Sequence, residues 1–326
     1  MPRGARYPDP SPDCVLWRLR DSWGYSLDAA GRSDKTKRNY FFSMARLGCY
    51  LEDNDLPTAP KKIRRQHIEA FLVDTRERTS SGNAAFHWRN LGALFLWLQE
   101  EGELGKKNPM EKVPQPTAPD IPRPQLEDDH IRALLDTCPE KSRDFFDRRD
   151  RLVIRLLVDT GIRVSGLAGL RYDPAPEHRE LDNPGINDVF LAQKLLRVRL
   201  KGGRVIMVPF GKAAAREVDR YLRARALRPQ APSGAFLLGI QGPLGPKGIQ
   251  KLLSRRAEQA GLDTAVHPHR FRRTFAHLWK KNGGGDAELM SIAGWKNRRM
   301  IDLYAGYAAQ ERAHAAHVQF SPGDRF

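Results

Sequence analysis

Hydrophobic residues in the first third of the chain recur every three or four positions, the period of one face of an amphipathic helix. The clearest stripe runs from Tyr40 to Leu51. Other faces of this predicted helix carry four basic side chains: Lys35, Lys37, Arg38 and Arg46. Similar spacing predicts further helices within residues 14–28, 68–72 and 86–98. The pattern therefore predicts a small helical bundle in this part of the chain.

Prolines interrupt the helical pattern between residues 108 and 125. Six of them fall in this stretch: Pro109, Pro114, Pro116, Pro119, Pro122 and Pro124. Proline stops helix propagation and favours an extended chain, and 326 residues exceed the usual size of a single domain. We predict a helical domain over residues 1–112, a proline-rich linker over 113–125 and a second domain over 126–326.

The second predicted domain mixes helices with one hairpin. Residues 131–135 and 152–158 are typical of core helices, and the helical period returns after Gly245. Between them, apolar residues at 196, 198 and 200 alternate with basic residues at 197, 199 and 201, and Gly202-Gly203 supplies a two-residue turn. Lys201 is thus predicted at the tip of the hairpin. The predicted fold class is mainly α, with a small β-hairpin or sheet in the second, mixed α/β domain.

The charge of the chain indicates its partner. A net charge of +16 and a pI near 10.0 favour a polyanion, either nucleic acid or an anionic membrane surface. No apolar run approaches the roughly 20 residues that span a bilayer, and residues 1–12 lack the apolar core of a signal peptide. We therefore predict a cytoplasmic protein that binds nucleic acid. Any single basic residue of the bundle could equally serve solubility alone.

Cysteine and histidine positions give no sign of a metal site. Cys14, Cys49 and Cys138 lie far apart, which fits neither a disulfide framework nor a zinc motif, so we predict reduced, buried thiols. His267 and His269 have no suitably spaced cysteine or carboxylate beside them. We predict neither a metal nor another cofactor.

A short motif follows Pro268, which fits the first position of a helix. His269 and Arg272, three residues apart, then project from the same side of the opening turn. The free amides and the positive dipole at a helix N-terminus attract an anion there. On its own this pair is a weak signal, because such pairs are common on protein surfaces.

Further residues in a fixed order strengthen that signal. Thr160-Gly161-Ile162-Arg163 follows an apolar helix, Lys201 lies on the hairpin, and Gly294-Trp295 comes nine residues before Tyr304. The ordered set resembles the tyrosine recombinase family, which includes phage integrases and the Xer-type and Cre-type site-specific recombinases. The match runs from about residue 126 to 307, and the preceding bundle resembles the core-binding domain of that family. The resemblance implies six catalytic residues: Arg163, Lys201, His269, Arg272, Trp295 and Tyr304.

Chemistry explains why these residue types occur together. Displacement at a phosphodiester without a metal needs fixed donors for the developing negative charge, and two arginines supply them. A phenol, with an ordinary pKa of about 10, attacks poorly unless positive neighbours and a base such as His269 favour its anion. The resemblance assigns protonation of the departing 5′ oxygen to Lys201 and donation to a phosphate oxygen to Trp295. It implies a 3′-phosphotyrosine intermediate made without metal or ATP, and hence activity in EDTA.

Two departures from the family pattern accompany these matches. Gly166 stands where the family usually has an acidic residue that orients the first arginine, so Arg163 needs other support. Arg273 replaces a common histidine, and we expect it to add positive charge towards DNA. Residues 172–185 are predicted to be a surface insertion, which loosens the alignment of Lys201. Tyr307 shares a helical face with Tyr304, but the spacing from Trp295 favours Tyr304 as nucleophile.

The resemblance also implies partners. It predicts double-stranded DNA with specific recombination sites and a homotetramer that forms on DNA by exchange of the last predicted helix, residues 308–317. We see no separate arm-binding domain before the bundle. The target site, the kind of recombination and any accessory directionality factor remain open.

Two other functions fit the basic charge. One is a non-catalytic regulator whose helices from Gly248 onward form a helix-turn-helix. The other is a topoisomerase that uses the same phosphotyrosine chemistry without paired sites. The first has no use for the complete set of six residues, and a Tyr304→Phe change would leave it unaltered.

Overall fold

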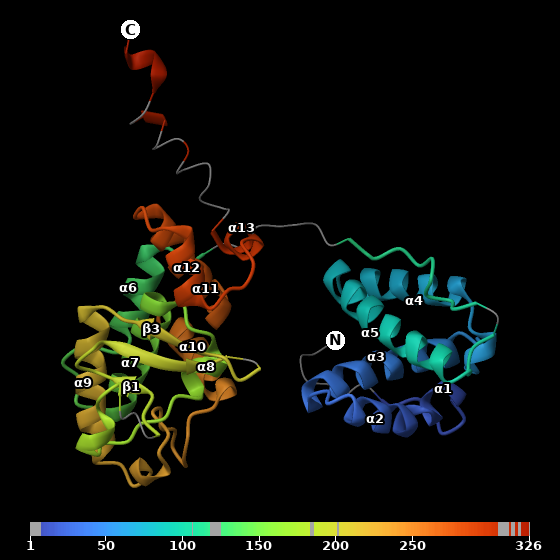
Figure 1. Ribbon diagram of the computed structural model, residues 1–326, viewed down its shortest axis with the longest axis horizontal. Coiled ribbons are helices and arrows are strands. Elements are labelled where there is room, and N and C mark those ends of the chain that lie inside the picture. Colours follow the sequence, from blue (N-terminus) through green and yellow to red (C-terminus); the bar gives the residue numbers. More distant parts are fainter. Residues whose placement is uncertain are drawn as a thin grey trace. The chain divides into compact units, whose positions relative to one another are not determined.

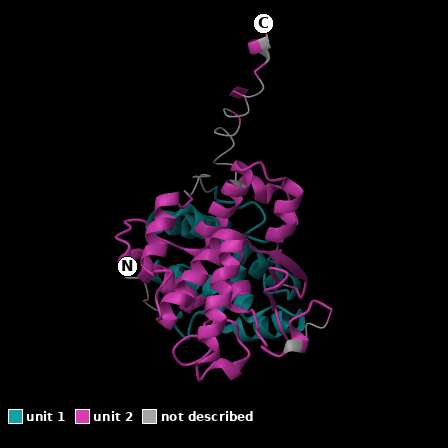
Figure 2. Cartoon of the chain, turned by 90° about the vertical axis from the view of Figure 1, so that its left-hand side faces the viewer, with its two compact units in different colours: residues 1–121 teal, residues 122–326 magenta. Residues whose placement is uncertain are grey.

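A computed structural model describes residues 8–105, 107–117, 125–182, 186–200 and 202–305, with 313, 317–318 and 321–325 (Figure 1). Contacts between residues divide the chain into two compact units, residues 1–121 and 122–326 (Figure 2). Each unit has a hydrophobic core of its own. No described helix is long and apolar enough to cross a membrane.

The first unit is built from helices. Their bounds are α1 (Val15–Arg18), α2 (Arg20–Ala29), α3 (Asp34–Asp53), the short 3-10 helix η1 (Pro60–Lys62), α4 (Arg65–Arg78) and α5 (Ser81–Glu100). Ser33 and Ser80 cap the two long helices, since each side chain accepts a hydrogen bond from a backbone amide three residues further on. The predicted stripe from Tyr40 to Leu51 is one face of α3.

The core of the first unit extends into the proline-rich stretch. Trp23, Phe71 and Phe95 are almost fully buried at its centre. Met110 and Val113 pack against the same cluster, and the Trp88 indole donates a hydrogen bond to the carbonyl of Val113 at 3.0 Å. The chain is therefore fixed to the bundle as far as Val113.

The second unit is mostly helical around one small sheet. In chain order its elements are α6 (Asp128–Asp136), α7 (Phe145–Thr160), α8 (Val164–Ala168), η2 (Pro176–His178), β1 (Val189–Phe190), β2 (Leu195–Arg199), β3 (Val205–Pro209), α9 (Lys212–Ala226), η3 (Ala231–Ser233), α10 (Pro246–Gln259), α11 (Pro268–Lys281), α12 (Asp286–Ala293), α13 (Arg299–Ala305) and η5 (Pro322–Arg325). Helix α7 packs against α6, α9, α10 and α11. It is the central helix of this unit.

The sheet has three antiparallel strands in the order β1-β2-β3. Leu196 pairs with Val208 and Val198 with Ile206, and the alternation buries Leu196 and Val198. Both turn glycines have positive φ, +84° at 202 and +79° at 203, a region that glycine adopts without strain. The predicted hairpin and the predicted fold class are confirmed. Lys201 lies outside the described residues.

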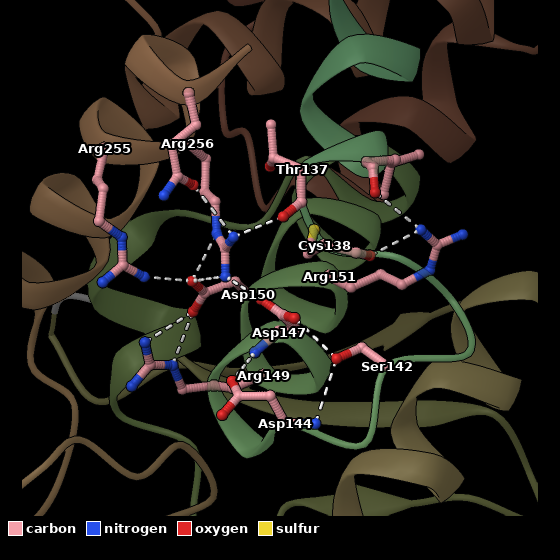
Figure 3. Close-up of polar contacts among 12 residues, drawn as sticks. Thr137, Cys138, Ser142, Asp144, Asp147, Arg149, Asp150, Arg151, Arg255 and Arg256 are labelled. Atoms are coloured by element: carbon pink, nitrogen blue, oxygen red, sulfur yellow. Dashed lines mark hydrogen bonds and ion pairs between the residues drawn. The ribbon is translucent and has the colours of Figure 1, made fainter.

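A buried charge network fixes α7 to α10 (Figure 3). The Asp150 side chain is fully buried and accepts hydrogen bonds from Arg149 at 2.7 Å, Arg255 at 2.6 Å and Arg256 at 2.8 Å. Arg256 also bonds Asp147 and the carbonyl of Thr137.

All three cysteines are buried and form no disulfide, as predicted.

Candidate active site

The turn after α7 places Arg163 beside α11. Gly161 ends α7 with φ +56°, and a Cβ atom on it would collide with the ring of Phe275. Only glycine allows this approach in this backbone conformation. Arg163 follows as the N-cap of α8 with an exposed side chain, and that side chain makes no hydrogen bond or ion pair with the described residues.

The space at Gly166 is taken by a strand residue. A Cβ atom there would lie 2.9 Å from Cγ1 of Val198 on β2, closer than real Cβ contacts come. An acidic side chain at 166 would thus require α8 and β2 to separate. Because residue 166 is glycine, no acidic side chain supports Arg163 from this position.

His269 lies in the first turn of α11, which begins at Pro268. Its ring stacks on that of His267, with centroids 5.8 Å apart and planes 4° from parallel. Loss of surrounding water lowers its pKa, and repulsion from the neighbouring His267, Arg272, Arg273 and Arg163 lowers the pKa further. The imidazole is therefore neutral at neutral pH and able to accept a proton.

Arg272 is the most enclosed cation of the group, with 3% of its surface exposed. Nη1 donates to the carbonyl of Gly161 at 2.7 Å and Nη2 to the carbonyl of Ala293 at 2.6 Å. Burial lowers its pKa to about 10, and the nearby Arg163 acts in the same direction. Arg272 is still charged at neutral pH, and among the described residues no carboxylate pairs with it. A buried cation without a counter-ion favours an anionic ligand.

Trp295 and Tyr304 pack against this arginine. The two rings are 5.2 Å apart, and the Arg272 guanidinium lies 5.0 Å from the centre of the Trp295 ring and 5.8 Å from that of Tyr304. Arg273 lies 5.7 Å from the Tyr304 ring. The buried Nε1 of Trp295 has no hydrogen-bond partner in the described part of the chain. An unpaired buried donor costs about 1–3 kcal/mol, which an acceptor on a ligand would recover.

A basic pocket opens next to these side chains. The described residues that line it include Trp295 and four cations, and none of them is acidic; the cations are Arg163, Arg199, Arg204 and Lys296. Sequence reasoning did not single out the last three as site residues. Only weak signals mark them: Arg199 and Arg204 flank the hairpin turn, and Lys296 follows Trp295.

Five of the six predicted site residues are therefore brought together in the second unit: Arg163, His269, Arg272, Trp295 and Tyr304. Arg273, predicted as a DNA contact, joins them at Tyr304. Lys201 and the rival Tyr307 lie outside the described residues. In the described part of the chain, no group of three His, Cys, Asp or Glu side chains is arranged to hold a metal ion.

The four basic residues predicted to contact DNA from the first unit all lie on α3. Lys35 and Arg38 are exposed. Lys37 instead pairs with Asp28 at 2.6 Å and with Asp34 at 3.2 Å. Arg38 and Arg46 line a second pocket together with aromatic side chains, among them Trp17 and Phe42. Their contact with DNA stays a prediction.

Comparisons with known proteins identify the class. The profile of the phage integrase family matches residues 124–311. Tyrosine recombinase XerD of Corynebacterium glutamicum is 30% identical over 273 residues, which cover 80% of this chain and 83% of the relative.

Solved structures share the fold. One is a XerH site-specific recombinase bound to palindromic difH substrate in a post-cleavage complex, with TM-score 0.72, 17% identity and coverage of 97% of this chain and 98% of that chain. Another is a lambda integrase tetramer bound to a Holliday junction, with TM-score 0.65, 20% identity and coverage of 87% and 78%.

The helical architecture with one small sheet is that of the tyrosine recombinases. The chain belongs to the phage integrase family, a family of site-specific DNA recombinases. The predicted family, fold class and enzyme class are thereby confirmed.

Proposed function

We propose that this recombinase cleaves and rejoins duplex DNA at specific sites through a covalent 3′-phosphotyrosine bond to Tyr304. The observation that carries the proposal is the packing of Tyr304 against Trp295 and beside the guanidinium groups of Arg272 and Arg273. Positive charge next to the phenol attracts the phosphate that the phenol attacks.

Two arginines and one indole hold the phosphate. Arg163 and Arg272 neutralise its non-bridging oxygens, and the unpaired indole N–H of Trp295 donates to one of them. The counter-ion that Arg272 lacks among the described residues is then the phosphate itself. Because the carbonyls of Gly161 and Ala293 already hold Arg272, little reorganisation of this arginine accompanies the charge that develops.

In the proposed cleavage step, a bond from Tyr304 to phosphorus replaces a bond of the DNA backbone. The Tyr304 oxygen bonds to phosphorus as the bond from phosphorus to the 5′ oxygen breaks. His269, neutral because its pKa is lowered, takes the phenolic proton, and Lys201 protonates the departing 5′ oxygen. The phosphotyrosine bond keeps the energy of the broken bond. Attack by a new 5′ hydroxyl then reverses the step, so the reaction requires neither metal nor ATP.

The partner is duplex DNA that carries two recombination sites. The net charge of +16 and the basic pocket supply attraction for the backbone. We propose a homotetramer on DNA, as in the lambda integrase complex, with exchange of the segment 308–317, most of which is not described. An accessory directionality factor and action on cytoplasmic DNA, in a bacterium or a phage-infected host, complete the proposal.

The test is a covalent adduct formed in EDTA. Duplexes that bind the protein are selected from random and flanking genomic DNA, nicked as suicide substrates and incubated with wild type, Tyr304→Phe and Tyr307→Phe. We expect an SDS-resistant adduct with wild type and Tyr307→Phe and none with Tyr304→Phe, because Tyr304 packs against Arg272 and Trp295.

Other outcomes identify the alternatives. Salt-sensitive binding with no adduct from any variant would favour the non-catalytic regulator. An adduct that survives in Tyr304→Phe but not in Tyr307→Phe would move the nucleophile to Tyr307. Relaxation of supercoiled DNA that lacks a selected site would favour a topoisomerase.

A further inference from the structure

A contact that the proposed mechanism does not use joins the β2–β3 hairpin to the turn that carries Trp295. Arg204 is the first residue after the two turn glycines, and its Nη2 donates a hydrogen bond to the carbonyl of Gly294 at 3.0 Å. The two residues are 90 positions apart in the chain. The hairpin tip and the Trp295 turn are thus directly bonded.

Gly294 fits closely under the hairpin. It ends α12 in the left-handed region with φ +65°, where side chains other than that of glycine are strained. A Cβ atom on it would lie 2.8 Å from Cδ1 of Leu200 and 3.1 Å from Cδ1 of Ile206. Backbone conformation and space both require glycine here, because the hairpin packs directly onto this turn.

Two arginines hold the end of α12 from different elements. The last carbonyls of a helix have no partner within the helix and carry partial negative charge. Arg272 of α11 donates to the carbonyl of Ala293 at 2.6 Å, and Arg204 of the hairpin donates to the next carbonyl, that of Gly294. Trp295 follows at once, with its amide bonded to the carbonyl of Met290 at 2.9 Å. The position of its indole therefore depends on both guanidinium groups.

We propose that Arg204 is a positioning residue that holds the Trp295 indole against the phosphate by fixing the turn at Gly294 to the hairpin. The proposal rests on the proposed function, since it assigns a role within that same site. Arg204 also lines the basic pocket, where its positive charge alone would attract a phosphate. The proposed role is separate from that attraction, because it depends on the hydrogen bond to Gly294.

The test compares Arg204→Gln with Lys296→Gln. Both changes remove one positive charge from the same pocket, but Lys296 makes no hydrogen bond or ion pair with the described residues. At saturating DNA we expect Arg204→Gln to lower the first-order rate of adduct formation by about 10- to 100-fold, the effect of a misplacement of about 1 Å. Lys296→Gln should lower that rate much less. An equal loss of rate in the two variants would mean that Arg204 acts only through its charge, and would overturn the proposal.

A double-mutant cycle shows whether Arg204 acts through Trp295. In a Trp295→Ala background, Arg204→Gln should cost no more than about twofold in the same rate, because the indole that it positions is gone. A loss as large as in the wild-type background would contradict the proposal.

A third measurement needs no activity. Arg204→Gln should speed amide hydrogen exchange at residues 293–297 of the intact, DNA-free protein, whereas Lys296→Gln should not. Unchanged amide exchange in Arg204→Gln would show that Arg204 does not fix this turn, even if the enzyme were active. Conversely, a wild-type protein that forms no adduct would reject the proposed function, and the exchange result would still decide whether Arg204 fixes the turn.

Discussion

The ionisation of His269 is set by the residues around it. Loss of water lowers its pKa, and His267 and three neighbouring arginines lower it further, so the neutral base persists below the usual range of histidine. The base form is lost as pH falls through this lowered pKa. Adduct formation should therefore keep its rate to a lower pH than a histidine with the ordinary pKa would allow.

A substitution of His267 tests how the neighbours of His269 set its pKa. The His267 ring lies 5.8 Å from that of His269, close enough for a positive charge on one ring to disfavour a positive charge on the other. We expect His267→Asn to raise the pKa of His269 and to move the acid limb of the rate profile to higher pH. The measurement is the rate of adduct formation between pH 5 and 8, pH values chosen to span roughly the ordinary histidine range.

A second variant tests the same effect on the pKa of His269 at another neighbouring charge. Arg273→Gln also removes a charge that lowers the pKa of His269, so its acid limb should move in the same direction. If neither variant shifts the limb, or if either shifts it down, His269 is not the group whose protonation stops the reaction.

At the scale of elements, the site depends on how α7 is held. This helix carries the Gly161 turn at one end and the Asp150 network in its middle, and the network bonds it to α10. The network contains more arginines than carboxylates. Asp150 is therefore the group on which the burial of Arg149 and Arg256 depends.

Removal of the Asp150 charge should destabilise the second unit. We expect Asp150→Asn to lower its free energy of unfolding by about 3–5 kcal/mol, because buried guanidinium groups lose their counter-ion. The control is Asp129→Asn, which removes an exposed partner of Arg132 and should cost less than about 1 kcal/mol. Urea unfolding followed by far-ultraviolet circular dichroism measures both. Similar costs for the two variants would show that the network contributes little.

At the scale of the whole molecule, the excess of positive charge governs DNA binding. Binding that releases counter-ions from DNA weakens as salt rises, and each phosphate contact adds about one to the slope of log K against log salt. On α3 the exposed Lys35 and Arg38 make no ion pair in the described chain, whereas Lys37 is held by Asp28 and Asp34. The three residues are thus not equivalent as DNA contacts.

This difference gives a prediction for the helix. Lys35→Gln and Arg38→Gln should each reduce the salt slope by about one, while Lys37→Gln should reduce it by less, since its charge is already partly compensated. Fluorescence anisotropy with a selected duplex at several salt concentrations measures the slopes. Unchanged slopes for Lys35→Gln and Arg38→Gln would mean that these residues serve solubility and not DNA.

The sequence by itself determined the features that local order encodes. The helical stripe on α3, the Gly-Gly hairpin and the start of α11 at Pro268 each follow from periodicity or turn chemistry within a few residues. The resemblance to the family followed from six residues in order, which needs no knowledge of contacts: Arg163, Lys201, His269, Arg272, Trp295 and Tyr304.

Only the tertiary structure decided how those residues are held. The bond from Arg204 to Gly294, the packing of Val198 against Gly166 and the network around Asp150 join residues that are many positions apart. No periodicity marks such pairs, because they form only where separate elements meet. The same physical reason explains why Arg199, Arg204 and Lys296 were recognised as pocket residues only in the folded chain.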